Sequence, residues 1–350
     1  MGAPLDAAAC RAVDTTGQIG ETLGLAEHLR DALWRVDSAA IVPVDARGGL
    51  IVAGMGGSSV GGRLAAGVLG PRLRRPLALA MGYDIPAWIG AETLVLCSSY
   101  SGSTEETLAT YDAAKCAGAP RIVSTTGGEL AERARADGVA VVPLPGGFQP
   151  RLAVGYSLVT ALEAAALCGA GPSLRGEVEA AAALAAELAG EWGPDGADDG
   201  EAKRLARALH GTFPVITGAG LTASVAYRWK CQINENAEMP AFASKLPEHD
   251  HNEIAGWAGA ERRLSAVFLE DSHADERLVR RVEGTAELAA EGAAVVERVS
   301  ARGETRLERL VSLVLLGDLV SLYMAVLRGV DPVSVRAIDV LKERLAAARA

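Results

Sequence analysis

The sequence has few cysteines, no C-x-x-C pair and no surplus of positive charge. Its five cysteines are scattered and odd in number, which argues against a disulfide framework or a thiolate metal site and favours a reducing, cytoplasmic setting. The formal net charge of −10 argues against nucleic acid or an anionic membrane as a partner, because both require a basic surface. We therefore expect a small-molecule partner.

No hydrophobic run is long and uninterrupted enough to indicate a membrane span. The most apolar stretch, residues 310–327, contains Asp318 and other polar residues, so we predict a buried core helix there. The first residues carry Asp6 in place of a basic region and have no long apolar core. We expect no export or lipid signal from them.

The pattern that is present is an alternation of short apolar runs with longer segments of helical period. Such alternation predicts an α/β fold in which parallel sheets are covered by helices on both faces. The expected strands are 50–53, 77–81, 93–98, 121–124, 139–143, 213–217, 264–269 and 293–299. The expected helices are 17–38, 59–69, 103–117, 128–136, 153–190, 274–290 and 304–328.

The chain repeats one pattern, a strand followed by a glycine turn and a helix. LIVAGMGG contains Gly54, and the strand at 213–217 runs into GAG, which begins at Gly218. From the length and this repeat we predict two similar α/β domains. We place them at 1–150 and 151–350, with a linker-like stretch, EWGPDGADDG, at 191–200.

The first glycine turn indicates an anion site. In LIVAGMGGSSVGGRL, Gly54, Gly56 and Gly57 permit close backbone approach at the start of a helix, where free N–H groups attract an anion. The dinucleotide fingerprint G-x-G-x-x-G fails at Ser59, and the P-loop motif fails at 62–63. The plain alternative is that the glycines only form a tight turn.

Hydroxyl side chains crowd the tip of another expected strand. CSSYSGSTEETL carries Ser99, Ser101, Ser103 and Thr104 directly before a helix, where hydroxyl and N–H donors can hold a phosphate without a cation. The alternative is a capping box with Glu106. Because both turns follow strands of one parallel sheet, they are expected to meet at one crevice.

A third cluster, KCQINENAEMPAFASKLPEHDHNEIAGW, is dense in titratable groups. Glu235 is either a general base or an exposed helical glutamate, and His251 either moves a proton or is an ordinary loop histidine. A metal site built from His249, Asp250, His251 and Glu253 is a weaker alternative, since no H-E-x-x-H motif is present.

Taken together, the motifs make the sequence resemble the sugar isomerase (SIS) fold and, within it, the bifunctional phosphoglucose/phosphomannose isomerase family of archaea and bacteria. The matching motifs occur in order along nearly the whole chain. They are GMGGS at 54–58, SYSGSTEET at 99–107, PR at 150–151, NENAE at 234–238, HNE at 251–253 and LK at 341–342.

The resemblance implies two three-layer α/β/α SIS domains and an aldose–ketose isomerase. The enzyme would interconvert glucose 6-phosphate or mannose 6-phosphate with fructose 6-phosphate through a cis-enediolate, without a metal or redox cofactor. Glu235 would be the base, His251 would open the sugar ring, and Arg151 would lie beside the reacting carbons. The implied contacts to the sugar phosphate are Gly56, Gly57, Ser58, Ser99, Ser101, Thr104 and Lys342.

The resemblance also implies a homodimer in which His251 reaches the site of the neighbouring subunit. The sequence departs from the family pattern at Glu238, Ser103, His249 and the DPVSV stretch at 331–335. None of these is the implied base or ring-opening histidine. The preference between the glucose and mannose epimers is therefore the property that they put in question.

Two other functions compete with an isomerase. A sugar-phosphate sensor built on SIS domains is one, although the first 45 residues hold no basic recognition helix. The other is an NAD(P)-dependent dehydrogenase that uses Gly218, Gly220 and Ala223 as its fingerprint and Glu238 for the ribose.

Overall fold

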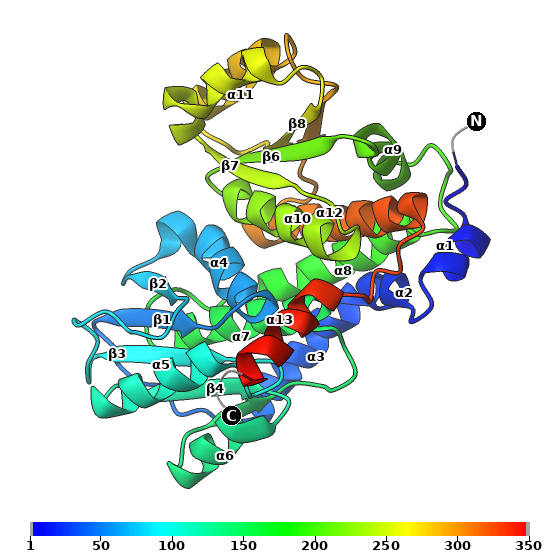
Figure 1. The fold of residues 1–350 in the computed structure, drawn as a ribbon. Coiled ribbons are helices and arrows are strands. Elements are labelled where there is room, and N and C mark those ends of the chain that lie inside the picture. Colours follow the sequence, from blue (N-terminus) through cyan, green and yellow to red (C-terminus); the bar gives the residue numbers. More distant parts are fainter. Residues whose placement is uncertain (1–2, 348–350) are drawn as a thin grey trace.

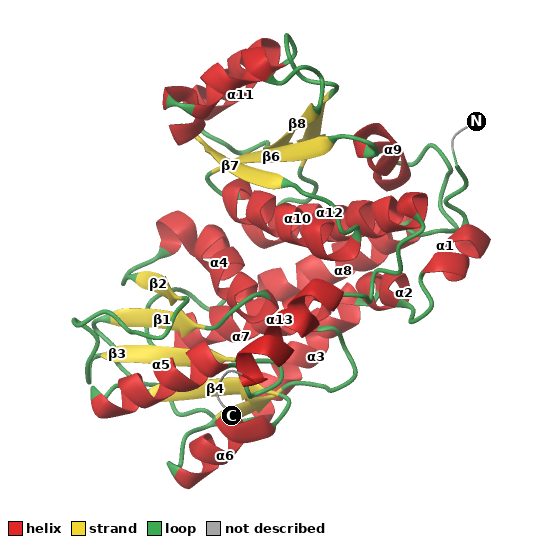
Figure 2. Cartoon of the chain, viewed as in Figure 1, coloured by secondary structure: helices red, strands yellow, loops and turns green. Residues whose placement is uncertain are grey.

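Two parallel sheets lie on opposite sides of a layer of helices (Figures 1 and 2). In this computed structural model the structure describes residues 3–347. The first sheet has the order β2-β1-β3-β4-β5 and the second β7-β6-β8-β9, with every neighbouring pair parallel. The strands are β1 (Gly49–Ala53), β2 (Leu77–Ala80), β3 (Thr93–Ser98), β4 (Arg121–Thr125), β5 (Val141–Pro143), β6 (Phe213–Ala219), β7 (Phe242–Leu246), β8 (Leu264–Glu270) and β9 (Val296–Ser300).

The eight predicted strands are all present, and β7 was missed. In β7 only Ser244 and Leu246 are buried, so this edge strand lacks the continuous apolar run that marks the others. The order β2-β1-β3-β4 recurs as β7-β6-β8-β9, which confirms two similar α/β units. The boundary near residue 150 stays a prediction.

The expected helices are all present, although two of them are each split, and the helices Ala7–Val13, Glu201–Leu209 and Arg336–Ala347 were not predicted. Gly24 divides the segment 17–38, and the turn at 168–174 divides the segment 153–190. The helices are α1 (Ala7–Val13), α2 (Gln18–Leu23), α3 (Leu25–Ser38), α4 (Gly57–Leu69), α5 (Glu105–Cys116), α6 (Gly128–Ala136), α7 (Val154–Leu167), α8 (Arg175–Trp192), α9 (Glu201–Leu209), α10 (Thr222–Asn236), α11 (Glu276–Ala289), α12 (Arg306–Arg328) and α13 (Arg336–Ala347). Single-turn 3₁₀ segments include η2 (Pro150–Ala153), η3 (Glu248–His251) and the longer η4 (Glu253–Gly259).

Each sheet buries side chains on both faces, so each unit has three layers. On the first sheet, Val52 faces the central helices and Ile51 faces α5 and α6; on the second, Ile216 and Val215 divide in the same way. The largest core cluster joins both units through α3, α4, α7, α8, α10 and α12. The central helices therefore form a layer that the two sheets share.

The apolar helix α12 belongs to this central layer. It is long and apolar enough to cross a membrane, but 89% of its most apolar window is buried inside the protein. It packs against α8, α9 and α10. This burial confirms the predicted core helix at residues 310–327.

Candidate functional site

The glycine turn after β1 lies directly against the segment that carries Arg151. A Cβ atom on Gly57 would lie 2.8 Å from the carbonyl oxygen of Pro150, so only glycine permits this approach. Gly56 has φ +51°, and α4 starts at Gly57 without a side-chain cap. The first N–H groups of α4 are thus free of side-chain acceptors, next to a buried arginine.

The hydroxyl-rich loop after β3 contacts the glycine turn through Ser58. The backbone N–H of Tyr100 donates to Ser58 Oγ over 3.1 Å. Ser99 is buried, and its Oγ lies 2.8 Å from Thr104 Oγ1 and accepts a bond from the N–H of Gly102. The two strand tips therefore meet at one place, as expected for strands of one parallel sheet.

The start of α5 does not form the capping box that the sequence left open. Thr104 is the N-cap residue, but its side chain makes no capping bond. Ser101 is exposed, and its Oγ accepts a bond from the N–H of Ser103 over 3.3 Å. Both helices at this edge, α4 and α5, therefore begin without a side-chain acceptor on their N–H groups, which favours an anion from outside the chain.

Arg151 and Glu235 come together beside these two turns. Glu235 lies in the last turn of α10, and its Oε2 is 3.5 Å from Arg151 Nη1. The Arg151 side chain is 4% exposed, whereas the Glu235 side chain is 29% exposed. Burial lowers the pKa of Arg151 from its ordinary value, and the Glu235 charge opposes that shift. A buried cation thus stands next to a carboxylate that a ligand can reach.

The C-terminal segment closes against the same arginine. The carbonyl oxygen of Pro332 accepts a bond from Arg151 Nη2, so the DPVSV stretch contacts the site through its backbone. Ser334 Oγ donates to Glu238 Oε1 over 3.5 Å. Two of the departures from the family pattern are therefore in contact with each other, close to Glu235.

Lys342 and His251 do not join this group within one chain. Lys342 is exposed on α13, and His251 is exposed in η3. Among the described residues, no hydrogen bond or ion pair links either of them to Glu235 or Arg151. Their roles stay predictions.

His249 is a buried structural residue. Its Nδ1 lies 2.7 Å from Ser244 Oγ, and its Nε2 accepts a bond from Trp257 Nε1 over 3.2 Å. Burial lowers the pKa of His249 below the usual value for a histidine. Asp250 is held by Arg281 and Thr285. These bonds occupy two of the four side chains of the alternative metal site, and within residues 3–347 no His, Cys, Asp and Glu side chains gather as metal ligands.

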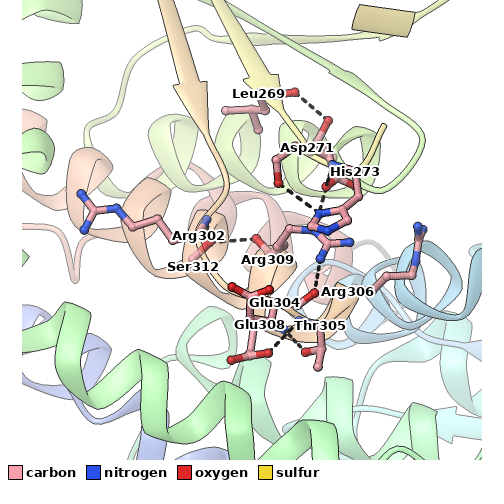
Figure 3. A network of polar contacts seen from close by, with 12 residues as sticks. Leu269, Asp271, His273, Arg302, Glu304, Thr305, Arg306, Glu308, Arg309 and Ser312 are labelled. Atoms are coloured by element: carbon pink, nitrogen blue, oxygen red, sulfur yellow. Dashed lines mark hydrogen bonds and ion pairs between the residues drawn. The ribbon is translucent and has the colours of Figure 1, made fainter. Parts of the chain in front are cut away.

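At the equivalent edge of the second sheet, several polar side chains bind partners within the protein (Figure 3). Thr222 Oγ1 accepts from the N–H of Ala219 and donates to the carbonyl of Leu269. Asp271 accepts from Arg309 Nε over 2.7 Å and from the N–H of His273. The side chains at this edge are therefore already paired, and both partners of the Asp271 ion pair are buried.

The geometry does not support the dinucleotide alternative. Gly220 follows β6, at the carboxyl edge of the second sheet, whereas Glu238 precedes β7. Because β6 and β7 are parallel, these two residues lie at opposite edges of the sheet. A ribose bound beside Gly220 cannot reach Glu238.

Sequence reasoning missed two residues of this site. Asn236 accepts a bond from Arg151 Nε over 2.7 Å, and Arg228 donates to the carbonyl oxygen of Arg151 over 3.0 Å. Asn236 stands within the NENAE motif, where it was quoted without a role. Arg228 has no local signal, because its partners come from segments remote in sequence.

Three comparisons with known proteins show the family and the fold of the chain. The sequence profile of the bacterial phospho-glucose isomerase C-terminal SIS domain matches residues 198–345. A bifunctional phosphoglucose/phosphomannose isomerase from Caldicellulosiruptor bescii is 37% identical over 85% of this chain and 89% of its own length, and one from Aquifex aeolicus is 36% identical over 85% and 90%. The C-terminal domain of the Francisella tularensis glucosamine-fructose-6-phosphate aminotransferase superposes with a TM-score of 0.66, at 15% identity, over 90% of this chain and 95% of that one, which shows the shared fold.

Proposed function

Because the chain belongs to the bifunctional phosphoglucose/phosphomannose isomerase family, we propose that it interconverts glucose 6-phosphate and mannose 6-phosphate with fructose 6-phosphate. The observation that carries the proposal is the approach of Arg151 Nη1 to Glu235 Oε2, beside the tips of two strands that are followed by helices without side-chain caps. This arrangement provides a base, a cation and an anion site within one region. An aldose–ketose isomerase needs these three parts.

The phosphate group would sit on the uncapped starts of α4 and α5. Backbone N–H groups of Gly56 and Gly57, with the hydroxyls of Ser58, Ser101 and Thr104, offer donors to a dianion. Ser99 is buried, and its hydroxyl is hydrogen-bonded to that of Thr104, so Ser99 holds the Thr104 side chain in place. The sugar carbons then extend toward Arg151 and Glu235.

In the chemical step, Glu235 removes the proton on C2 of the open-chain aldose and returns it to C1, while the hydroxyl proton passes from the oxygen of C2 to the oxygen of C1, so that C2 becomes the carbonyl carbon. The electron pair of the broken C–H bond forms the cis-enediolate, whose negative charge develops on the oxygens of C1 and C2. Arg151 stabilises that charge, and its burial strengthens the interaction because water screens it little. The step consumes no external oxidant or reductant.

We propose that the active enzyme is a homodimer in which His251 of one subunit opens the ring bound in the other. The exposure of His251 on η3 and its separation from Glu235 within the chain support this arrangement. Lys342, on α13, is proposed to contact the substrate phosphate. Mixing inactive E235Q and H251A subunits tests the shared site, because exchange creates one intact site per heterodimer and about one quarter of wild-type activity. No recovery after proven exchange would contradict it.

We also place the enzyme in the cytoplasm. All five cysteines are free thiols, and three of them are buried. Burial raises the pKa of Cys97 to about 12, so this thiol stays protonated. Unpaired cysteines are typical of proteins from reducing compartments.

The decisive experiment is a coupled assay of fructose 6-phosphate formation from each aldose phosphate, with and without a chelator. We expect turnover of both substrates that survives the chelator, since no step requires a metal. Saturable binding of the sugar phosphates without turnover would support the sensor alternative. Turnover that the chelator abolishes would contradict the proposed chemistry.

A further inference from the structure

A buried network of hydrogen bonds holds Arg151. The other residues of this network have no direct part in the proposed isomerase reaction. Asn236 Oδ1 accepts from Arg151 Nε over 2.7 Å, and Asn236 Nδ2 donates to Ser321 Oγ over 2.9 Å. Ser321 in turn donates to the backbone carbonyl of Asp318 over 2.7 Å. Asn236 and Ser321 are both almost completely buried, so neither is exposed to a bound ligand.

The polarity of this network fixes the orientation of the Asn236 amide. The Ser321 proton is used by the Asp318 carbonyl, so the Ser321 oxygen must accept from Asn236. The amide nitrogen therefore faces Ser321, and the amide oxygen faces the N–H of Arg151. Reversing the amide would place donor against donor on the Arg151 side, which a buried site does not tolerate.

A buried ion pair supports the backbone of the same arginine. Arg228 binds Asp318 through two bonds, Nε to Oδ1 over 2.9 Å and Nη2 to Oδ2 over 2.5 Å. Arg228 Nη2 also donates to the carbonyl oxygen of Arg151. Asp318 on α12 thus receives both branches of the network, one through Arg228 and one through Ser321. A bidentate pair fixes direction as well as distance.

Three groups contact the guanidinium of Arg151 and fix its orientation. Its Nε binds Asn236, its Nη2 binds the Pro332 carbonyl, and its Nη1 approaches Glu235. Without the Asn236 contact, the guanidinium could rotate about its last side-chain bonds and withdraw Nη1 from the carboxylate. A displacement of about 1 Å at a reacting centre costs on the order of 10²-fold in rate.

We propose that Asn236 is a positioning residue of the isomerase: it orients the Arg151 guanidinium toward the place where the enediolate charge develops. The proposal rests on the proposed function. A residue of this kind changes binding of the transition state more than binding of the substrate. Replacing a residue that only stabilises the fold changes the binding of substrate and of transition state equally, or changes neither.

The test compares Asn236→Ala with Asn234→Ala. Asn234 is the same residue type on the same helix, but it accepts from the N–H of Ala241 and does not contact Arg151. We expect N236A to lower kcat/KM by about 10²-fold and to weaken binding of a phosphorylated aldonate, a planar anionic mimic of the enediolate, by a similar factor. Affinity for glucitol 6-phosphate, which lacks the planar anion, should stay within about threefold of wild type, a span of under 1 kcal/mol. N234A should resemble wild type in all three.

A double-variant cycle with Arg151→Met separates positioning from stability. If Asn236 acts through Arg151, adding N236A to R151M should lower kcat/KM little further. Asn236→Leu preserves the side-chain volume and serves if N236A fails to fold. Given an active wild-type enzyme, three outcomes would overturn this proposal while leaving the proposed function intact. The folded Asn236 variant could show unchanged kinetics, it could lose affinity for both ligands equally, or the effects of N236A and R151M could be additive. An inactive wild-type chain would overturn the proposed function and this proposal with it.

Discussion

Four strands of the first sheet have the same order as the four strands of the second, yet the side chains that accept bonds from backbone N–H groups at the two carboxyl edges differ. At the first sheet, α4 and α5 start without side-chain caps. At the second, α10 also starts without a side-chain cap, although Thr222 accepts from the N–H of Ala219 just before it, and Asp275 caps α11 by accepting from the N–H of Arg277. The two units therefore share a scaffold and differ at the helix that follows the third strand of each repeat order, because α5 starts without a side-chain cap and α11 starts with one.

The second unit contributes chemistry from a different part of its scaffold. Glu235 and Asn236 end α10, next to the amino edge of the second sheet, because β7 starts only at Phe242. Through the shared helical layer this end of α10 meets Arg151, whose backbone lies against the glycine turn of the first unit. We infer a division in which one unit binds the phosphate and the other supplies the base.

The largest expected effect comes from removing the base. Glu235→Gln keeps the size of the side chain but cannot accept the C2 proton, so we expect kcat to fall by about 10³-fold or more, with sugar-phosphate binding retained. Glu238→Gln is the matched control, since Glu238 is bonded to Ser334 and lies three residues further on, beyond the end of α10. Steady-state rates and calorimetric binding measure the two effects. Unchanged turnover in E235Q would refute the assignment of the base.

A stability effect of similar size is expected at the second sheet edge, without an effect on substrate. Asp271→Asn leaves the buried charge of Arg309 without its partner, which typically costs about 3–5 kcal/mol of unfolding free energy. Urea unfolding should show the loss, while KM for fructose 6-phosphate stays unchanged. A raised KM would mean that this edge also holds phosphate.

A smaller effect is expected from one hydroxyl of the open edge. Ser101→Ala removes one donor to the phosphate, and a hydrogen bond to a charged group is worth about 1.5–3 kcal/mol, or about 10- to 100-fold in KM. Ser272→Ala, at the second edge, should leave KM unchanged. Equal effects of the two variants would erase the distinction between the edges.

The smallest expected effect concerns pH and the buried His249. Folding holds this histidine neutral, so its contribution to stability is full above the usual histidine pKa of about 6.5 and is lost as the pH falls below that value. His249→Leu should therefore flatten part of the fall in Tm between about pH 7 and pH 5.5. His273→Leu, at an exposed histidine, is the control. An equal acid dependence in H249L and wild type would contradict this reading.

The strands and the glycine-rich and hydroxyl-rich turns that follow β1 and β3 were predictable because their signals are local. Apolar runs end in glycine at Gly54 and Gly218, and hydroxyls follow β3 directly. The edge strand β7 escaped prediction because only one face of it is buried. His249 was weighed as a metal ligand because its neighbours in sequence are acidic, whereas its partners in space are Ser244 and Trp257.

The sequence by itself determined the α/β class, the repeated unit and the types of side chain available for catalysis, since periodicity and turn chemistry act over a few residues. Only the tertiary structure decided which of those side chains meet. Arg151 and Glu235 are separated by the whole of α7, α8, α9 and β6, and they approach because α4 and α10 pack together in the shared helical layer. The Asn236 network was equally invisible, because it depends on burial against α12. Contacts of this kind follow from the packing of helices and not from any local pattern.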